Sequence, residues 1–153
     1  MKKVVIMRGA PGFGKSTYVK KTYPAATVAS ADHYFERKGK YEFNKFLLGK
    51  AHNECQKTFS SAIERGDELI VLDNTNVKVR DFKPYVEEAK AAGYEVEIVR
   101  LDCDVTKATA RGVHAVPGSA VERMAESLRT SKLPEGWTET VVKTDADTDE
   151  KTA

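Results

Sequence analysis

Residues Gly9–Thr17 read GAPGFGKST and contain the pattern G-x-x-x-x-G-K-S, which constrains the fold more than any other segment. Glycines let the backbone curl so that successive N–H groups face phosphate oxygens, and the following helix adds its positive N-terminal end. The β-branched run Lys3–Met7 precedes the pattern and a helical segment, Lys15–Tyr23, follows it. The sequence therefore predicts a phosphate-binding loop between a buried strand and a helix.

The residues of this loop have separate expected roles. The loop is expected to enclose the phosphates of a purine nucleoside triphosphate, with ATP and Mg²⁺ as the expected cofactors. Lys15 is expected to reach the β and γ phosphates and to act in catalysis, and the Ser16 hydroxyl is expected to hold the metal ion. A glycine-rich turn without a ligand is the alternative, which the position between strand and helix disfavours. The expected cofactor-binding residues are Gly9, Ala10, Pro11, Gly12, Phe13, Gly14, Lys15, Ser16 and Thr17.

Short apolar runs alternate with amphipathic segments along the chain. Strands are expected at Lys3–Met7, Ala26–Ala29, Glu68–Leu72 and Glu95–Leu101. Helices are expected at Lys15–Tyr23, Glu42–Arg65, Phe82–Ala92, Val105–Arg111 and Ser119–Ser131. This alternation requires right-handed crossovers. It predicts an α/β fold of the P-loop NTPase or kinase type, with a central parallel sheet of about four to five strands flanked by helices and a helical lid.

Four residues come directly after predicted elements of this sheet: Gly9, Asp32, Asp73 and Asp102. Because parallel sheets bind ligands at the carboxyl ends of their strands, we expect these residues to meet along one edge. Asp73 follows an apolar run and is expected to bind Mg²⁺ together with Ser16. An Asx turn or a helix N-cap at Asp73 is the alternative.

Phosphoryl transfer to a hydroxyl needs a base and a cation. Asp32 is the candidate base, placed to accept the hydroxyl proton, although a carboxylate there could instead cap a helix. Arg111 on the predicted lid is the candidate cation for the charge that develops on the transferred group. Arg123, Arg129 and Lys107 compete for this role. Any of them, taken alone, is more often a solvated helix charge.

The histidines and cysteines do not predict a metal site. His33, His52 and His114 lack the mutual spacing of metal ligands, and apolar neighbours on the long helix favour a structural role for His52. Cys55 and Cys103 do not have the spacing of a metal-binding pair. Both are expected to be free thiols in a reducing compartment.

Length and charge suit one soluble domain. The chain has 153 residues and a net charge of +2, too mild to identify a nucleic-acid binder by charge alone. No apolar run approaches the ~20 residues of a membrane span, so we expect a cytoplasmic protein without a membrane partner. The kinase domain is expected at residues 1–138, followed by a polar, acidic tail at 139–153 that is disordered or loosely docked. The sequence predicts no oligomeric state.

Taken together, four segments resemble the polynucleotide 5′-hydroxyl kinase family of P-loop proteins, particularly the phage type of kinase domain. The resemblance spans roughly Met1–Arg129. It rests on Gly9–Thr17, on Asp32, on Asn74-Thr75-Asn76, and on Arg111-Gly112-x-x-Ala115-Val116-Pro117. The last segment is distinctive, because generic P-loop proteins have no reason to share it.

The resemblance implies a kinase that moves the γ phosphate of ATP to a 5′-hydroxyl of DNA or RNA, in the host cytoplasm if the chain is phage-encoded. Lys15 and Ser16 would contact ATP and Mg²⁺. Asp32 would be the general base, and Arg111 would contact the donor phosphates. A nucleic acid would be the partner, and these roles agree with those drawn from the residues themselves.

Two positions leave the acceptor open. With Asp73 before Asn74, the segment resembles that of a sister group of P-loop proteins, which has the sequence Asp-Asn-Thr-Asn. Phe35, three residues past Asp32, stands where the phage kinases place an arginine for the acceptor's phosphate. The expected acceptor-binding residues are Asn74, Asn76 and Arg37, where Arg37 or else Lys38 would replace the arginine that is missing at Phe35. A hydroxymethylated DNA base, a nucleoside or another small alcohol is the alternative acceptor, and an ATP-binding switch module is the alternative of another class.

Overall fold

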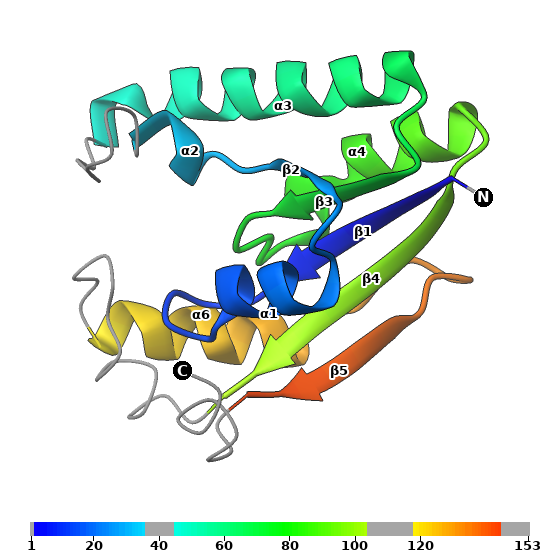
Figure 1. Ribbon diagram of the computed structural model, residues 1–153. Coiled ribbons are helices and arrows are strands. Elements are labelled where there is room, and N and C mark those ends of the chain that lie inside the picture. Colours follow the sequence, from blue (N-terminus) through cyan, green and yellow to red (C-terminus); the bar gives the residue numbers. More distant parts are fainter. Residues whose placement is uncertain (1, 36–44, 104–117, 145–153) are drawn as a thin grey trace.

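In the part of the chain that the structure describes, the central sheet has five strands, all of them parallel. Of the 153 residues, the computed structural model describes 2–35, 45–103 and 118–144. The strands lie in the order β2-β3-β1-β4-β5 (Figure 1). They are β1 Lys3–Arg8, β2 Thr27–Ala29, β3 Leu69–Asp73, β4 Glu95–Asp102 and β5 Glu139–Lys143. This sheet, flanked by helices, confirms the predicted fold class.

Strand β1 lies at the centre of the sheet, and its register with β3 and β4 determines which residues lie at the carboxyl edge, called here the functional edge. Met7 is in register with Asp73 of β3 on one side and with Val99 of β4 on the other. Because all three strands run in the same direction, the loops that leave their carboxyl ends begin at one edge of the sheet. Residues Val4–Met7 are fully buried, as expected for a strand that helices cover on both faces.

Different helices cover the two faces of the sheet (Figure 1). Alternate residues of β1 point to opposite faces. Val4 and Ile6 belong to the core under α3 and α4, whereas Val5 and Met7 belong to the core under α1 and α6. The helices are α1 Lys15–Thr22, α2 Asp32–Phe35, α3 Leu48–Arg65, α4 Val79–Ala91 and α6 Gly118–Thr130, with a 3-10 turn at Lys45–Leu47.

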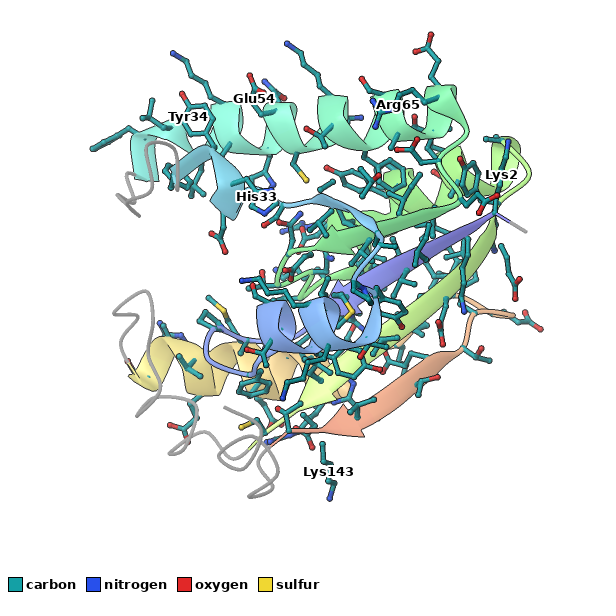
Figure 2. The ribbon with its side chains drawn as sticks, viewed as in Figure 1. Lys2, His33, Tyr34, Glu54, Arg65 and Lys143 are labelled. Atoms are coloured by element: carbon teal, nitrogen blue, oxygen red, sulfur yellow. The ribbon has the colours of Figure 1, made fainter. Side chains whose placement is uncertain are left out.

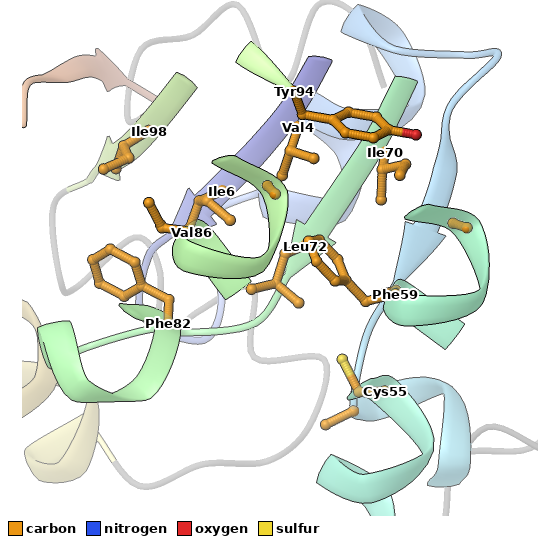
Figure 3. Packing of buried hydrophobic residues seen from close by; sticks show 14 of the residues in the cluster. Val4, Ile6, Cys55, Phe59, Ile70, Leu72, Phe82, Val86, Tyr94 and Ile98 are labelled. Carbon is orange, nitrogen blue, oxygen red and sulfur yellow. The ribbon is translucent and has the colours of Figure 1, made fainter. Parts of the chain in front are cut away.

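The core beneath α3 and α4 is built from β-branched and aromatic side chains. Figure 3 shows how the helices meet the strands there. The labelled residues include Val4, Ile6, Ile70 and Leu72 of the sheet, Phe59 of α3, and Phe82 and Val86 of α4. Phe59 and Phe82 are fully buried, so both helices are fixed to the sheet near the functional edge.

Two helices begin elsewhere than the sequence predicts. The helix predicted from Phe82 begins at Val79, because the Lys78 N–H donates to the Asp81 carboxylate at 3.1 Å and caps the helix. Helix α3 begins at Leu48 rather than near Glu42, after the 3-10 turn. Residues 36–44 and the helix predicted at Val105–Arg111 lie outside the described residues. In the described part of the chain, no helix has both the length and the apolar character that a membrane crossing needs.

The polar C-terminal segment contains a strand. Glu139–Lys143 form β5, which pairs in parallel with β4, so the sheet continues beyond the domain boundary expected at residue 138. Ion pairs compensate for the low apolar content. The Glu139 carboxylate accepts from Arg8 at 2.9 Å and from Arg100 at 2.8 Å. An edge strand needs only one paired side and one buried face, which explains why its composition resembled that of a tail. Residues 145–153 lie outside the described part.

Candidate active site

The phosphate-binding loop connects β1 to α1 at the functional edge. Gly12 and Gly14 have φ of 82° and 86°, a left-handed conformation that glycine adopts without steric cost. Between them, Phe13 is 1% exposed and its N–H donates to the Ala10 carbonyl at 3.1 Å. The Gly9 N–H donates to the Thr75 carbonyl at 3.1 Å and so ties the loop to the segment after β3. The loop thus has the curled backbone that its sequence predicted.

Lys15 lies over this loop at the start of α1. Its Nζ is 3.5 Å from the Ala10 carbonyl oxygen. Burial lowers the pKa of Lys15, and the nearby carboxylates of Asp73 and Asp32 raise it in part. Both carboxylates therefore favour the charged form of Lys15, and a buried ammonium attracts a phosphate more strongly than an ammonium in water does.

Ser16 and Asp73 form the next part of the site. The Ser16 hydroxyl donates to Asp73 Oδ2 at 3.3 Å. Asp73 is 7% exposed, and burial raises the pKa of its carboxyl, while Lys15 and the Ser16 hydrogen bond lower it in part. A hydroxyl and a carboxylate are the hard oxygen ligands that Mg²⁺ prefers, and the metal usually completes its shell with water and phosphate oxygens. The two side chains therefore fit the predicted magnesium position.

Asp32 begins the short helix α2 and joins this cluster. The Asp32 N–H donates to the Ser30 hydroxyl at 3.2 Å, a contact that helps to fix the start of this helix. The charge of Asp32 raises the pKa of both Lys15 and Asp73, so Asp32 contributes to the electrostatics of the same site. Figure 2 shows the neighbouring residues His33 and Tyr34 on α2, beside the N-terminal part of α3.

Asn74 positions the segment that carries Asp32. Its Oδ1 accepts from the Ala31 N–H at 2.9 Å, and its Nδ2 donates to the Cys55 sulfur at 3.5 Å. Both cysteines are free and buried, as predicted. The amide of Asn74 thus links β3, α3 and the residue before Asp32. The structure gives the Asn74 side chain a positioning role, and the predicted contact of Asn74 with the acceptor stays a prediction.

Asn76 is part of the scaffold. It is 3% exposed, adopts a φ of 45°, and donates from Nδ2 to the Met7 carbonyl at 2.7 Å. Its own carbonyl accepts from Arg8 Nε at 2.8 Å. Its amide is thus buried and bonded to the backbone of β1, and a contact of Asn76 with the acceptor stays a prediction.

Arg8 is a residue that sequence reasoning missed. It is 0% exposed and donates to the carbonyls of Asn76 and Val77, each at 2.8 Å, and to Glu139 at 2.9 Å. Its guanidinium also lies 4.9 Å from the centre of the Phe82 ring. Burial lowers the pKa of Arg8, and Glu139 raises it in part. A charged residue at the end of an apolar strand was the available signal in the sequence.

A polar groove opens between α3 and α4, next to the end of β3. Its volume is ≈ 420 Å³. Exposed side chains of α3 line one side of it, including His52, which was expected to be a structural histidine and is not. The lining residues are His52, Asn53, Gln56, Asn74, Thr75, Asn76, Asp81, Pro84 and Tyr85. Asn74 therefore borders both this groove and the Asp32 segment.

The structure describes only some of the basic residues that were expected near the phosphates. Arg111, Lys107 and Arg37 lie outside the described residues. Arg129 of α6 pairs with Asp102 at 3.1 Å, so this competitor is engaged at the end of β4. Asp102 lies at the predicted edge but is directed to α6, whereas Asp32 and Asp73 share the surroundings of Lys15. Phe35 is 5% exposed and packs in the core.

Comparison with known sequences gives a match over most of the chain. Residues 4–131 match the family model described as an AAA domain. The human NEDD4-binding protein 2 is 32% identical over 130 residues, which is 80% of this chain. The human YLP motif-containing protein 1 is 30% identical over 156 residues, which is 84% of this chain. The chain spans only 7% of the length of each of these relatives.

Solved structures match over a larger part of the chain. A putative kinase from Chloroflexus aurantiacus has a TM-score of 0.67 at 17% identity, covering 94% of this chain and 89% of that one. The Pnkp1/Rnl/Hen1 RNA repair complex contains a chain with a TM-score of 0.67 at 20% identity, covering 91% and 50%. A gluconokinase from Sinorhizobium meliloti 1021 has a TM-score of 0.61 at 16% identity, covering 97% and 86%. At such identities the likeness concerns the fold alone.

Proposed function

Since the chain belongs to the AAA domain family and has the fold of P-loop kinases, we propose that it transfers the γ phosphate of ATP to a hydroxyl, namely the 5′-hydroxyl of DNA or RNA. The observation that carries this proposal is the cluster of Lys15, Ser16, Asp73 and Asp32 at one edge of the sheet. A cation, two oxygen ligands and a further carboxylate are the groups that phosphoryl transfer requires.

The donor is held by the loop and its helix. Backbone N–H groups of the loop and the Lys15 ammonium bind the β and γ phosphates. Ser16 and Asp73 would hold Mg²⁺, which when bound offsets the negative charge of these phosphates. ATP and Mg²⁺ remain proposals for this chain, supported by the Ser16–Asp73 hydrogen bond of 3.3 Å beside the loop.

The chemical step uses Asp32. Its carboxylate accepts the proton of the acceptor hydroxyl while the hydroxyl oxygen forms a bond to the γ phosphorus. The bond from the γ phosphorus to the bridging oxygen breaks, and ADP leaves with the electron pair of that bond. Asn74 fixes the backbone before Asp32 through Ala31, so that the carboxylate is held beside the phosphates. Arg111 is proposed as the cation on the donor phosphates.

Three features support a nucleic-acid acceptor. The segments that resemble polynucleotide 5′-hydroxyl kinases include Asp32 and Arg111-Gly112-x-x-Ala115-Val116-Pro117. A chain of the Pnkp1/Rnl/Hen1 RNA repair complex has the same fold. The groove between α3 and α4 borders Asn74. The amide and hydroxyl groups that line this groove suit the terminal base and sugar of a nucleic-acid strand.

A second candidate is a kinase of a small hydroxyl compound, a nucleoside or a hydroxymethylated DNA base. Phe35 is buried where the phage kinases place an arginine for the acceptor's phosphate, so the described residues supply no cation there. None of the residues that line the groove is lysine or arginine. A groove lined by the carboxylate of Asp81 and by no lysine or arginine favours an acceptor without a phosphate beside the reacting hydroxyl.

A labelling experiment distinguishes these functions. The full chain is incubated with γ-labelled ATP, Mg²⁺ and one acceptor at a time: 5′-hydroxyl DNA, 5′-hydroxyl RNA, their 5′-phosphorylated forms, hydroxymethyl-containing DNA, nucleosides and gluconate. Lys15→Met is the control for contaminating kinases. Label on 5′-hydroxyl ends alone supports the first function, and label on hydroxymethyl DNA or a small compound supports the second. ATP binding without label on any acceptor would sink both and favour a nucleotide-binding switch module.

A further inference from the structure

The C-terminal strand reaches the phosphate-binding loop through one hydroxyl. Thr144, the residue after β5, donates from Oγ1 to the Phe13 carbonyl at 2.6 Å, although 131 positions separate the two residues. Its own N–H donates to the Asp102 carbonyl at 2.8 Å, which extends the pairing of β5 with β4. Thr144 is 7% exposed and Phe13 is 1% exposed. The contact is therefore buried, and the pairing of β5 with β4 holds Thr144 in position for it.

Phe13 stands between two glycines of the loop. Gly12 and Gly14 both adopt positive φ, and glycine backbones lose the most conformational freedom when they are fixed. The Phe13 N–H is held by the Ala10 carbonyl at 3.1 Å. Thr144 holds the other polar group of this residue, so both backbone groups of Phe13 have fixed partners.

Peptide geometry connects this contact to the ligand. The Phe13 carbonyl and the Gly14 N–H belong to one planar peptide unit and point in opposite directions. A carbonyl held by Thr144 therefore fixes the direction of the Gly14 N–H. N–H groups of such loops bind phosphate oxygens, and their orientation before binding decides how much ordering the ligand must impose.

We propose that Thr144 is a positioning residue for nucleotide binding, whose hydroxyl aims the Gly14 N–H into the phosphate site. The proposal rests on the proposed ATP binding. The proposal gives a role in binding the phosphate donor to residues 139–144, which belong to the segment that composition predicted to be a tail. Strand β5 is anchored at its start as well, because Glu139 accepts from Arg8, which also holds the Asn76 and Val77 carbonyls.

Three variants of the full chain test this role. Thr144→Val removes the hydroxyl and keeps the shape, and Thr144→Ser keeps the hydroxyl. Thr140→Val makes the same change at an exposed position of β5. Thr144→Val is expected to raise the ATP dissociation constant about tenfold, the loss typical of one buried hydrogen bond, and to leave the KM for the acceptor unchanged. Thr144→Ser and Thr140→Val are expected to bind ATP as the unaltered chain does.

A second measurement does not depend on ATP. Hydrogen exchange at the Gly14 amide, followed by NMR in the nucleotide-free protein, is expected to accelerate in Thr144→Val and not in Thr144→Ser. Equal ATP affinity in Thr144→Val and the unaltered chain, or equal losses in the valine and serine variants, would overturn the proposal. If the unaltered chain bound no ATP, the proposed function would fail, and the Gly14 exchange rates would still decide whether Thr144 orders the loop.

Discussion

The Ser16 hydroxyl donates a hydrogen bond of 3.3 Å to Asp73 Oδ2, although the two residues are 57 positions apart. One belongs to the helix after β1 and the other ends β3, and the parallel register of these strands places both at the same edge. Lys15 and Asp32 complete the cluster through their charges. The relationship joins the two expected magnesium ligands and supports the predictions that follow.

Asp73→Asn is expected to reduce kcat/KM about 100-fold, because charge stabilisation through a bound metal is worth several kcal/mol in the transition state. The amide keeps the shape and can still accept from Ser16. Initial rates at varied Mg²⁺ concentration measure the effect. Asp67→Asn, before the amino end of β3, is the matched control, since Asp67 pairs with Arg65 away from the site. Equal losses in both variants would contradict the assignment of Asp73.

The stability of the protein should depend on the ionisation of Asp73. Burial raises the pKa of Asp73 above the ordinary value of 3.8, so the folded state disfavours the ionised form. Below the ordinary pKa, Asp73 is protonated in both states and does not destabilise the fold. As the pH rises from the ordinary pKa to the raised pKa of the folded state, Asp73 lowers the free energy of unfolding progressively. Asp73→Asn should therefore raise the free energy of unfolding at neutral pH. Urea unfolding across this window, without Mg²⁺, measures it; a lower stability of the variant at neutral pH would refute the argument.

Asp32→Asn is expected to lower kcat by a factor of roughly 100 to 10,000, the usual contribution of a general base, while the ATP dissociation constant changes little. The amide cannot accept the hydroxyl proton. Kinase assays and direct ATP titration separate the two effects. An unchanged kcat would remove Asp32 from the chemical step, and a parallel loss of ATP binding would indicate a structural role.

Asn74→Ala is expected to weaken catalysis about tenfold by freeing the Ala31 N–H, whose hydrogen bond to Asn74 measures 2.9 Å. The displaced segment carries Asp32, so kcat and the acceptor KM should change while ATP affinity does not. Asn74→Asp keeps an acceptor oxygen and should retain more activity than the alanine variant. The same activity in both variants would show that the contact with Ala31 is not needed.

Glu139→Gln is expected to lower the free energy of unfolding by about 3 kcal/mol, since it leaves the buried Arg8 charge without its anionic partner. The side chain of Arg8 is 0% exposed, so water cannot replace the lost carboxylate. Chemical denaturation measures the change, with Glu135→Gln on the exposed loop as the control. A loss no greater than that of the control would mean that the Asn76 and Val77 carbonyls satisfy Arg8 by themselves.

The sequence predicted the parts of this protein that depend on local pattern. The glycine spacing of Gly9–Thr17 predicted the loop, because positive φ at Gly12 and Gly14 is a local requirement. The β-branched runs predicted β1, β3 and β4 to within a residue at each end, since buried parallel strands need continuous apolar side chains.

Only the tertiary structure decided which polar side chains serve the site and which serve the scaffold. Asn74 and Asn76 lie two residues apart and look alike in sequence, yet one positions Ala31 and the other is buried against Met7. The strand Glu139–Lys143 could not be recognised locally, because its stability comes from pairing with β4 and from ion pairs to Arg8 and Arg100. Such contacts join residues far apart in the chain, and no local propensity encodes them.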